Sequence, residues 1–280
     1  MYRMNRSLEV FVMKAKQFLA FGFWEALVFM IIASTAPVIS GGLLSFPPLS
    51  GPQQGISSQF QSFITLDYAY YQFFITIIVM AIFVLKVVVF DFAANLEQGI
   101  ETSYILLPVK RSRLLIPVYL IGVVFPYALA SASVFYALYL VHYSMNLNAA
   151  LSVALLDFLP LLFVSSIALL VAMKSRSSLA TLGVTVVAFF LLGIFLGENT
   201  LFMANTHSIL PLLLLGLLFP AGSVYVYFTF GYIPSGQSLI STPSGFISVF
   251  PWLIAGCVLL NVFLVGLVSW YWGTKFQISG

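Results

Sequence analysis

The sequence has little charge. Only 7% of its 280 residues are Asp, Glu, Lys or Arg, whereas soluble domains carry about 25%. Hydrophobic residues make up 61% of the chain, and its mean hydropathy is +1.09. A water-soluble globule of this size could not cover its exterior with so few polar residues. The composition therefore excludes an ordinary soluble protein and predicts an integral membrane protein.

Motifs for catalysis and metal binding are also missing. The chain has one cysteine, Cys257, so it cannot form an internal disulfide. It lacks the GxxxxGK[ST] loop that cradles nucleotide phosphates and the HExxH motif that binds zinc. Its two histidines, His142 and His207, are far apart in sequence and do not suggest a metal site. We expect a non-catalytic chain with no metal or cofactor of its own.

Long apolar runs are what the sequence does contain. A membrane-spanning helix needs about 20 mostly apolar residues. A further apolar stretch, 208–230, is interrupted by Pro211, Gly216, Pro220 and Gly222, which suits a re-entrant helical hairpin that enters from the outer side and returns better than a seventh span. Six uninterrupted runs are predicted to be spans: 18–40, 69–90, 114–141, 151–173, 179–197 and 249–272.

Residues 1–17 have a different pattern, that of a basic amphipathic helix. Such a helix lies in the membrane interface with its apolar face in the lipid. The alternative is a frayed tail. The apolar residues recur at helical spacing and share one face: Met4, Leu8, Phe11, Ala15 and Phe18. The bases fall off this face: Arg3, Arg6, Lys14 and Lys16.

The distribution of basic residues predicts the orientation. Bases cluster at 3–16, at 110–113, at Lys174 and Arg176, and at Lys275. With six spans all four groups lie on one side, which the positive-inside rule makes the cytoplasm; with seven, the last would lie outside. We expect one all-α transmembrane domain over 1–280 in the plasma membrane, with both termini cytoplasmic. A net charge of +3 then reflects basic loops beside lipid and does not suggest nucleic acid.

The segment between the second and third spans concentrates charge. Glu97 and Glu101 stand at i,i+4 and repel each other, which suggests a cationic partner outside the helix. The acids precede the bases, as the helix dipole favours, and Pro108 ends the predicted helix. The alternative is a solvated loop whose bases follow the positive-inside rule. One helical face is predicted to be polar, with Asn95, Glu97, Gln98, Glu101 and Thr102.

The stretch "EQGIETSYILLPVKRSRLL" resembles the segment after the second span of ABC-2 type permeases, the membrane subunits of a class of ABC transporters. The six-span layout with an N-terminal interfacial helix and an external hairpin is also similar to that family. Ile100 departs from the pattern, because Thr is common there. The matching positions are Glu97, Gly99, Glu101, Leu106, Leu107, Pro108, Lys110, Arg111 and Arg113.

The resemblance implies a function. It makes 92–107 a cytoplasmic coupling helix that docks into a separate ATPase subunit, which holds the ATP and magnesium. It also implies a second permease subunit, in a homodimer or heterodimer, and transport out of the cell. The rival classes are a membrane enzyme of unknown chemistry and a structural membrane anchor. The expected contacts with the ATPase are Asn95, Glu97, Gln98, Gly99, Glu101, Thr102, Leu106, Leu107 and Pro108, followed by a basic turn at Lys110, Arg111 and Arg113.

A few charges fall within or beside the predicted spans. Glu25 and Lys86 both lie near the cytoplasmic side, and pairing would lower the cost of burying either. Asp157 falls about two turns into the fourth span from outside, and Asp67 begins the second span. None of these is clearly a deep carboxylate at the midplane, which argues against a proton-coupled carrier.

Overall fold

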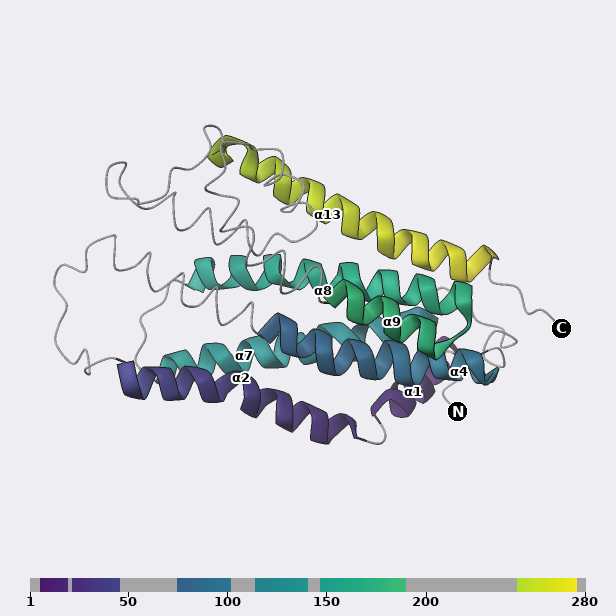
Figure 1. Cartoon of the computed structure of the whole chain (residues 1–280), viewed down its shortest axis with the longest axis horizontal. Helices are drawn as coiled ribbons and strands as arrows, with labels where there is room; N and C mark the ends of the chain where they lie inside the picture. Colours follow the sequence, from purple (N-terminus) through teal and green to yellow (C-terminus); the bar gives the residue numbers. More distant parts are fainter. Residues whose placement is uncertain are drawn as a thin grey trace.

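A computed structural model describes residues 6–19, 22–45, 75–101, 114–140, 147–189 and 246–275. Every regular element in these ranges is helical (Figure 1). The elements are α1 (Arg6–Leu19), α2 (Phe23–Ser45), η1 (Met80–Ala93), α4 (Ala94–Glu97), α6 (Ile116–Tyr119), η3 (Leu120–Val124), α7 (Phe125–Leu140), α8 (Leu147–Ser175), α9 (Ser178–Phe189), α13 (Phe246–Trp270) and η5 (Tyr271–Lys275). The elements η1, η3 and η5 are π-helical and continue their α-helical neighbours.

Four helices in the described residues are long and apolar enough to cross a membrane. They cover Ile75–Glu97, Ile116–Leu140, Ala154–Ser175 and Pro251–Thr274, and they overlap the predicted second, third, fourth and last spans. A bent pair of helices near the N-terminus would make a fifth. The short helix α9 is apolar and begins where the fifth span was predicted. The described part of the chain is therefore all-helical, and its long apolar helices indicate a membrane-embedded protein.

The N-terminal segment bends instead of entering the first span directly. The helix over Leu8–Leu19 meets the helix over Phe23–Ala36 at 63°. Gly22 lies at this bend with φ +74°, a left-handed conformation that costs glycine little. Phe18, near which the first span was predicted to begin, belongs to α1, and α2 begins at Phe23.

The buried face of α1 also differs from the prediction. Val10, Lys14 and Phe18, spaced four residues apart, are buried against the bundle. Leu8, which was predicted to share the face of Phe18, is 50% exposed. The sequence pattern misplaced the face because it counted Lys14 as solvent-facing, whereas an anion in the bundle makes its burial possible.

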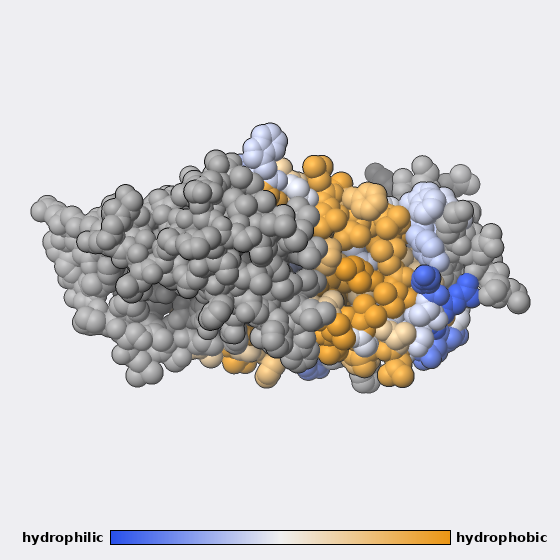
Figure 2. Space-filling model, turned by 45° about the horizontal axis from the view of Figure 1, so that its top comes forward, coloured by the Kyte–Doolittle hydropathy of each residue, from blue (hydrophilic) through white to orange (hydrophobic). Residues whose placement is uncertain are grey.

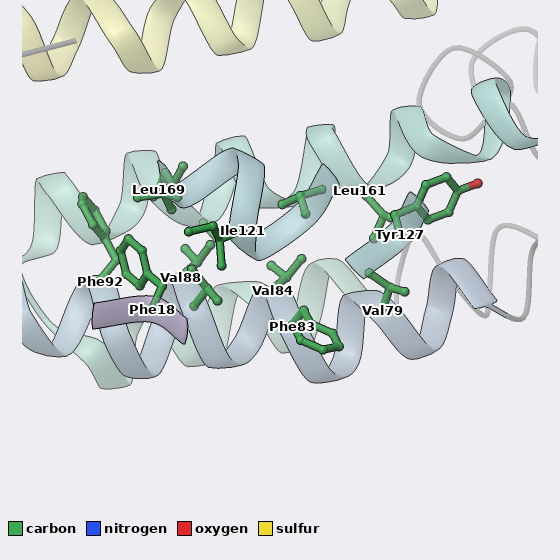
Figure 3. Close-up of a cluster of buried hydrophobic side chains, with 14 of the residues drawn as sticks. Phe18, Val79, Phe83, Val84, Val88, Phe92, Ile121, Tyr127, Leu161 and Leu169 are labelled. Carbon is green, nitrogen blue, oxygen red and sulfur yellow. The ribbon is translucent and has the colours of Figure 1, made fainter. Parts of the chain in front are cut away.

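The helix over Ile75–Glu97 lies at the centre of the bundle. It packs against α8, α9 and η3, and its buried side chains belong to a cluster that continues along most of its length (Figure 3). At Gly122 the two backbones come close: a Cβ added there would lie 2.9 Å from Val87 Cβ. Figure 3 shows Phe18 and Phe92 toward one end of this core and Tyr127 toward the other.

The outer surface of the bundle is apolar. Large side chains that point outward include Phe29, Tyr139, Leu179, Trp252 and Phe263. Figure 2 shows apolar residues over the visible middle of the molecule and hydrophilic residues gathered at one end. Such an exterior suits hydrocarbon chains of lipid and would be costly in water.

Polar side chains inside the helices bond to carbonyls of their own helix. Thr35, Thr181 and Thr185 each donate to the carbonyl four residues earlier at 2.7 to 2.8 Å. In lipid every polar group must find a partner within the protein, so these bonds let the hydroxyls remain at membrane depth.

Candidate functional site

The charged end of the bundle is the candidate site. We use this name for the region formed by the C-terminal part of the helix over Ile75–Glu97, the turn at 98–101, α1 and the turn between α8 and α9. Figure 1 shows α1 and α4 at the same end, with the last residues of α13. Of the predicted contacts, Asn95, Glu97, Gln98, Gly99 and Glu101 lie in this region. The others lie outside the described residues: Thr102, Leu106, Leu107, Pro108, Lys110, Arg111 and Arg113.

The described part of the segment 92–107 is not one continuous helix, as was predicted for the whole segment. The spanning helix continues through α4, and a turn at Gln98 and Gly99 interrupts it. The Gly99 N–H donates to the Leu96 carbonyl at 3.2 Å, and Gly99 has φ +76°. A residue with a side chain rarely adopts this conformation, so glycine ends the helix here. The local role of Gly99 is to end the helix, and this role does not depend on a partner approaching its backbone.

A buried ion pair joins α1 to the end of this segment. Lys14 Nζ lies 2.6 Å from Glu101 Oε2, and both side chains are fully buried. The Lys14 ammonium also lies over the rings of Phe92, at 5.4 Å, and Phe18, at 5.7 Å. The faces of two aromatic rings and one carboxylate thus surround the Lys14 ammonium. Phe18 comes from α1, Phe92 from the helix over Ile75–Glu97, and Glu101 from the segment that follows this helix.

Burial shapes the electrostatics of this pair. It raises the pKa of the Glu101 carboxyl and lowers the pKa of the Lys14 ammonium, because dry surroundings disfavour both charged forms. The attraction between the two groups opposes both shifts. Each charge therefore depends on the other. The repulsion between Glu97 and Glu101 suggested a cationic partner, and Glu101 has one in Lys14 of the same chain. Glu101 was predicted to be a surface residue, but it is buried.

A second contact at this end of the bundle joins Glu97 to the start of α9. Its Oε2 accepts hydrogen bonds from the Ser178 N–H at 2.9 Å and the Ser178 hydroxyl at 2.6 Å. Ser178 is the first residue of α9, where backbone N–H groups lack helical partners and a negative charge is favoured. The preceding Arg176 has φ +51°, so a tight turn brings α8 back into α9 beside Glu97.

Between the Glu97–Ser178 contact and the Glu101–Lys14 contact, the chain is exposed. Glu97, Gln98, Gly99 and Ile100 are consecutive exposed residues, and Ile100 is 41% exposed despite its apolar side chain. We call them the exposed turn. Lys174 at the end of α8 is also exposed at this end of the bundle. The arrangement offers a small surface on a rigid support.

An aromatic contact adds the C-terminal helix to the same region. The Phe92 ring lies 5.7 Å from the ring of Trp272, and Trp272 is fully buried. Sequence reasoning missed both Lys14 and Trp272 as members of this site. The sequence signal for Lys14 was its spacing: it follows Val10 by four residues and precedes Phe18 by four. Residues four apart in a helix lie on the same face, so Lys14 shares the face of these two apolar residues.

The other charges near the membrane also differ from expectation. Lys86 pairs with Asp91 at 3.0 Å, and Glu25 is exposed on α2, so the predicted Glu25–Lys86 pair is wrong. A carboxylate five residues away on the same helix is a nearer partner than one on another helix. Asp157 is buried in α8, whereas Asp67 lies outside the described residues.

The part of the chain that the structure describes holds no group of three or more His, Cys, Asp or Glu side chains that could bind a metal. His142, His207 and the stretch 208–230 lie outside it. The polar contacts described at the charged end join helices to one another. No protein-family model matches this chain, and a comparison with curated proteins gives no significant match.

Proposed function

We propose that this chain is the membrane-spanning subunit of an ATP-driven exporter, and that a separate ATPase binds the exposed turn. The observation that carries the proposal is the way this turn is held. Glu97 is bonded to α9 and Glu101 to α1, while the residues between them are exposed. The resemblance of this segment to that of ABC-2 type permeases supplies the kind of partner.

Force applied to the exposed turn would reach three parts of the bundle. It would pass directly along the helix over Ile75–Glu97, through the buried ion pair to α1, and through Ser178 to α9. Close-packed helices move as rigid units and do not bend easily. Closure of the ATPase would then change the packing of several helices at once and alternate access to a central path.

The rest of the proposal follows the sequence pattern. Six spans, an external hairpin at 208–230 and cytoplasmic termini would place the charged end in the cytoplasm, as its bases favour. One such chain would form half of a path through the plasma membrane. A second copy or a related subunit would complete it, and two ATPase subunits would supply the energy.

The burial of Glu101 changes which variants test the proposal. Reversing its charge would leave Lys14 without an anion and would disturb folding, so a loss of binding would not be informative. Ile100→Asp and Gln98→Arg alter exposed side chains that are members of neither contact. Leu140→Asp is a matched control, because Leu140 is a 53% exposed apolar residue at the opposite end of α7.

The test is purification of the tagged full chain from native membranes in mild detergent, followed by mass spectrometry. We expect a P-loop ATPase to co-purify with the unaltered chain and with the Leu140→Asp variant. The double variant at Ile100 and Gln98 should lose most of this ATPase while remaining in the membrane. If no ATPase co-purifies with the unaltered chain, the proposal is wrong, and the enzyme and anchor classes take its place.

A further inference from the structure

A groove lies between α13 and the helices it faces. Its volume is about 510 Å³, within the range of roughly 300–1,000 Å³ typical of ligand pockets. One wall comes from α6, η3 and α8, including Tyr119, Phe158 and Leu162. The opposite wall is a stripe of α13 that includes Asn261, Val262 and Val265.

The groove faces hydrocarbon at its rim. Val262 is 65% exposed and Leu120 is 40% exposed, and both line it on the outer surface of the bundle. Its walls are almost entirely apolar. A molecule dissolved in the membrane could therefore enter sideways without crossing a polar barrier.

One polar group in the wall lacks a partner. Asn261 is only 2% exposed, and its side-chain N–H group donates to the Cys257 carbonyl at 3.0 Å. Among the described residues its Oδ1 accepts no hydrogen bond. The Tyr119 hydroxyl on the opposite wall is already bonded to Ser166 at 3.0 Å. An unsatisfied buried acceptor is costly, so a donor from a ligand would be favoured here.

The depth of Asn261 limits which molecule can supply that donor. Asn261 is ten residues after Pro251 and thirteen before Thr274, the two ends of the span. At 1.5 Å per residue it lies about 15 Å from one end of the helix and about 20 Å from the other. At this depth a phospholipid presents only acyl chains, which carry no donor. A phospholipid can fill the groove but cannot satisfy Asn261.

We propose that this groove binds an apolar molecule that carries a hydroxyl or amide N–H donor, and that Asn261 Oδ1 accepts that hydrogen bond. Identifying the molecule as transported cargo rests on the proposed function; the binding itself does not. The site would select its ligand by one directional bond in otherwise apolar surroundings, where no water competes.

Two photoreactive probes that differ only in the donor test this proposal. One is hexadecanol carrying a diazirine in its chain, and the other is its methyl ether. The full chain in phosphatidylcholine nanodiscs is labelled with each probe, and the labelled peptides are identified by mass spectrometry. We expect about fivefold more labelling of the groove by the alcohol than by the ether, the effect of one net hydrogen bond.

Three variants separate the bond from the shape of the groove. Asn261→Leu should label equally with both probes. Val262→Trp should lower labelling by both, because the larger ring fills the groove from an exposed position. Leu259→Trp is its control, since Leu259 is 68% exposed on the same helix but does not line the groove.

Two results would overturn the proposal. Equal labelling of the unaltered chain by both probes would show a groove that takes hydrocarbon alone. Absence of groove labelling, with disulfide-linked dimers formed by Val262→Cys, would show that a second copy occupies it. Donor-dependent labelling of a chain that binds no ATPase would retain the groove as a ligand site and refute the transporter assignment.

Discussion

The charged end of the bundle and the contact between α13 and α8 are held together in different ways. At the charged end, an ion pair of 2.6 Å and two hydrogen bonds from Ser178 to one oxygen of Glu97 join the elements. Along α13 most side chains point outward, and its contact with α8 leaves a groove containing an unsatisfied amide oxygen. The first region is suited to transmitting a displacement, and the second to admitting a ligand or a change in helix spacing.

The largest effect is expected from Glu101→Gln. This variant leaves the Lys14 ammonium buried without an anion, which should lower the free energy of unfolding by about 3–5 kcal/mol. The measurement is unfolding of the purified chain in mixed micelles by a denaturing detergent. The double variant Lys14→Met, Glu101→Leu removes both charges and should recover most of the loss; an equal loss in both would show that packing, and not charge, is responsible.

A smaller effect is expected from Gly122→Ala. The added methyl group would overlap Val87 at 2.9 Å and force two closely packed helices apart, at a cost of about 1–3 kcal/mol. Gly266→Ala on α13 is the matched control, because nothing lies within 4 Å of its added Cβ. It should be neutral or stabilise the helix by up to about 1 kcal/mol. Equal destabilisation by both in the same unfolding assay would contradict the difference in packing.

Gly99→Ala should destabilise by about 1–2 kcal/mol, since alanine is strained at φ +76°. The change lies in the exposed turn, so it should also weaken co-purification of the ATPase while the protein remains folded. Comparing the unfolding assay with the purification assay separates these effects. A variant as stable as the unaltered chain would show that the turn adopts another conformation in solution.

The smallest effect is expected from Asn261→Leu. Replacing a half-satisfied buried amide by an apolar side chain of similar size should change the free energy of unfolding by less than about 1 kcal/mol, or increase it. The same assay in micelles without added ligand measures it. A loss of several kcal/mol would mean that the amide serves the fold, and that α13 resembles the charged end after all.

Much of the fold could be predicted from hydropathy. Four of the spanning helices lie where apolar runs of suitable length occur, because length and apolarity are local properties of the sequence. The bend at Gly22 could not be predicted in this way, since an apolar run continues across it. The turn at Gly99 was also missed, because one glycine inside a helical pattern ends the helix only in some contexts.

The candidate site was predicted in outline but not in detail. The local charge pattern identified the segment containing Glu97 and Glu101, and the repulsion between them correctly suggested a cation. Local pattern could not identify Lys14 as that cation. Lys14 and Glu101 are far apart in the sequence and meet only when α1 packs beside the end of the helix over Ile75–Glu97. It also could not place Ser178, whose helix joins the site through a turn after α8.

The ion pair between Lys14 and Glu101 has a consequence for the order of synthesis and membrane insertion. The ribosome makes α1 long before it makes Glu101, so the Lys14 ammonium has no carboxylate to meet while the first span is being inserted. Until then hydration must stabilise the charge, which keeps α1 at the water-facing edge of the membrane. The ion pair that docks the N-terminus can form only after Glu101 has been made, so a chain stalled before residue 101 should still expose α1 to protease.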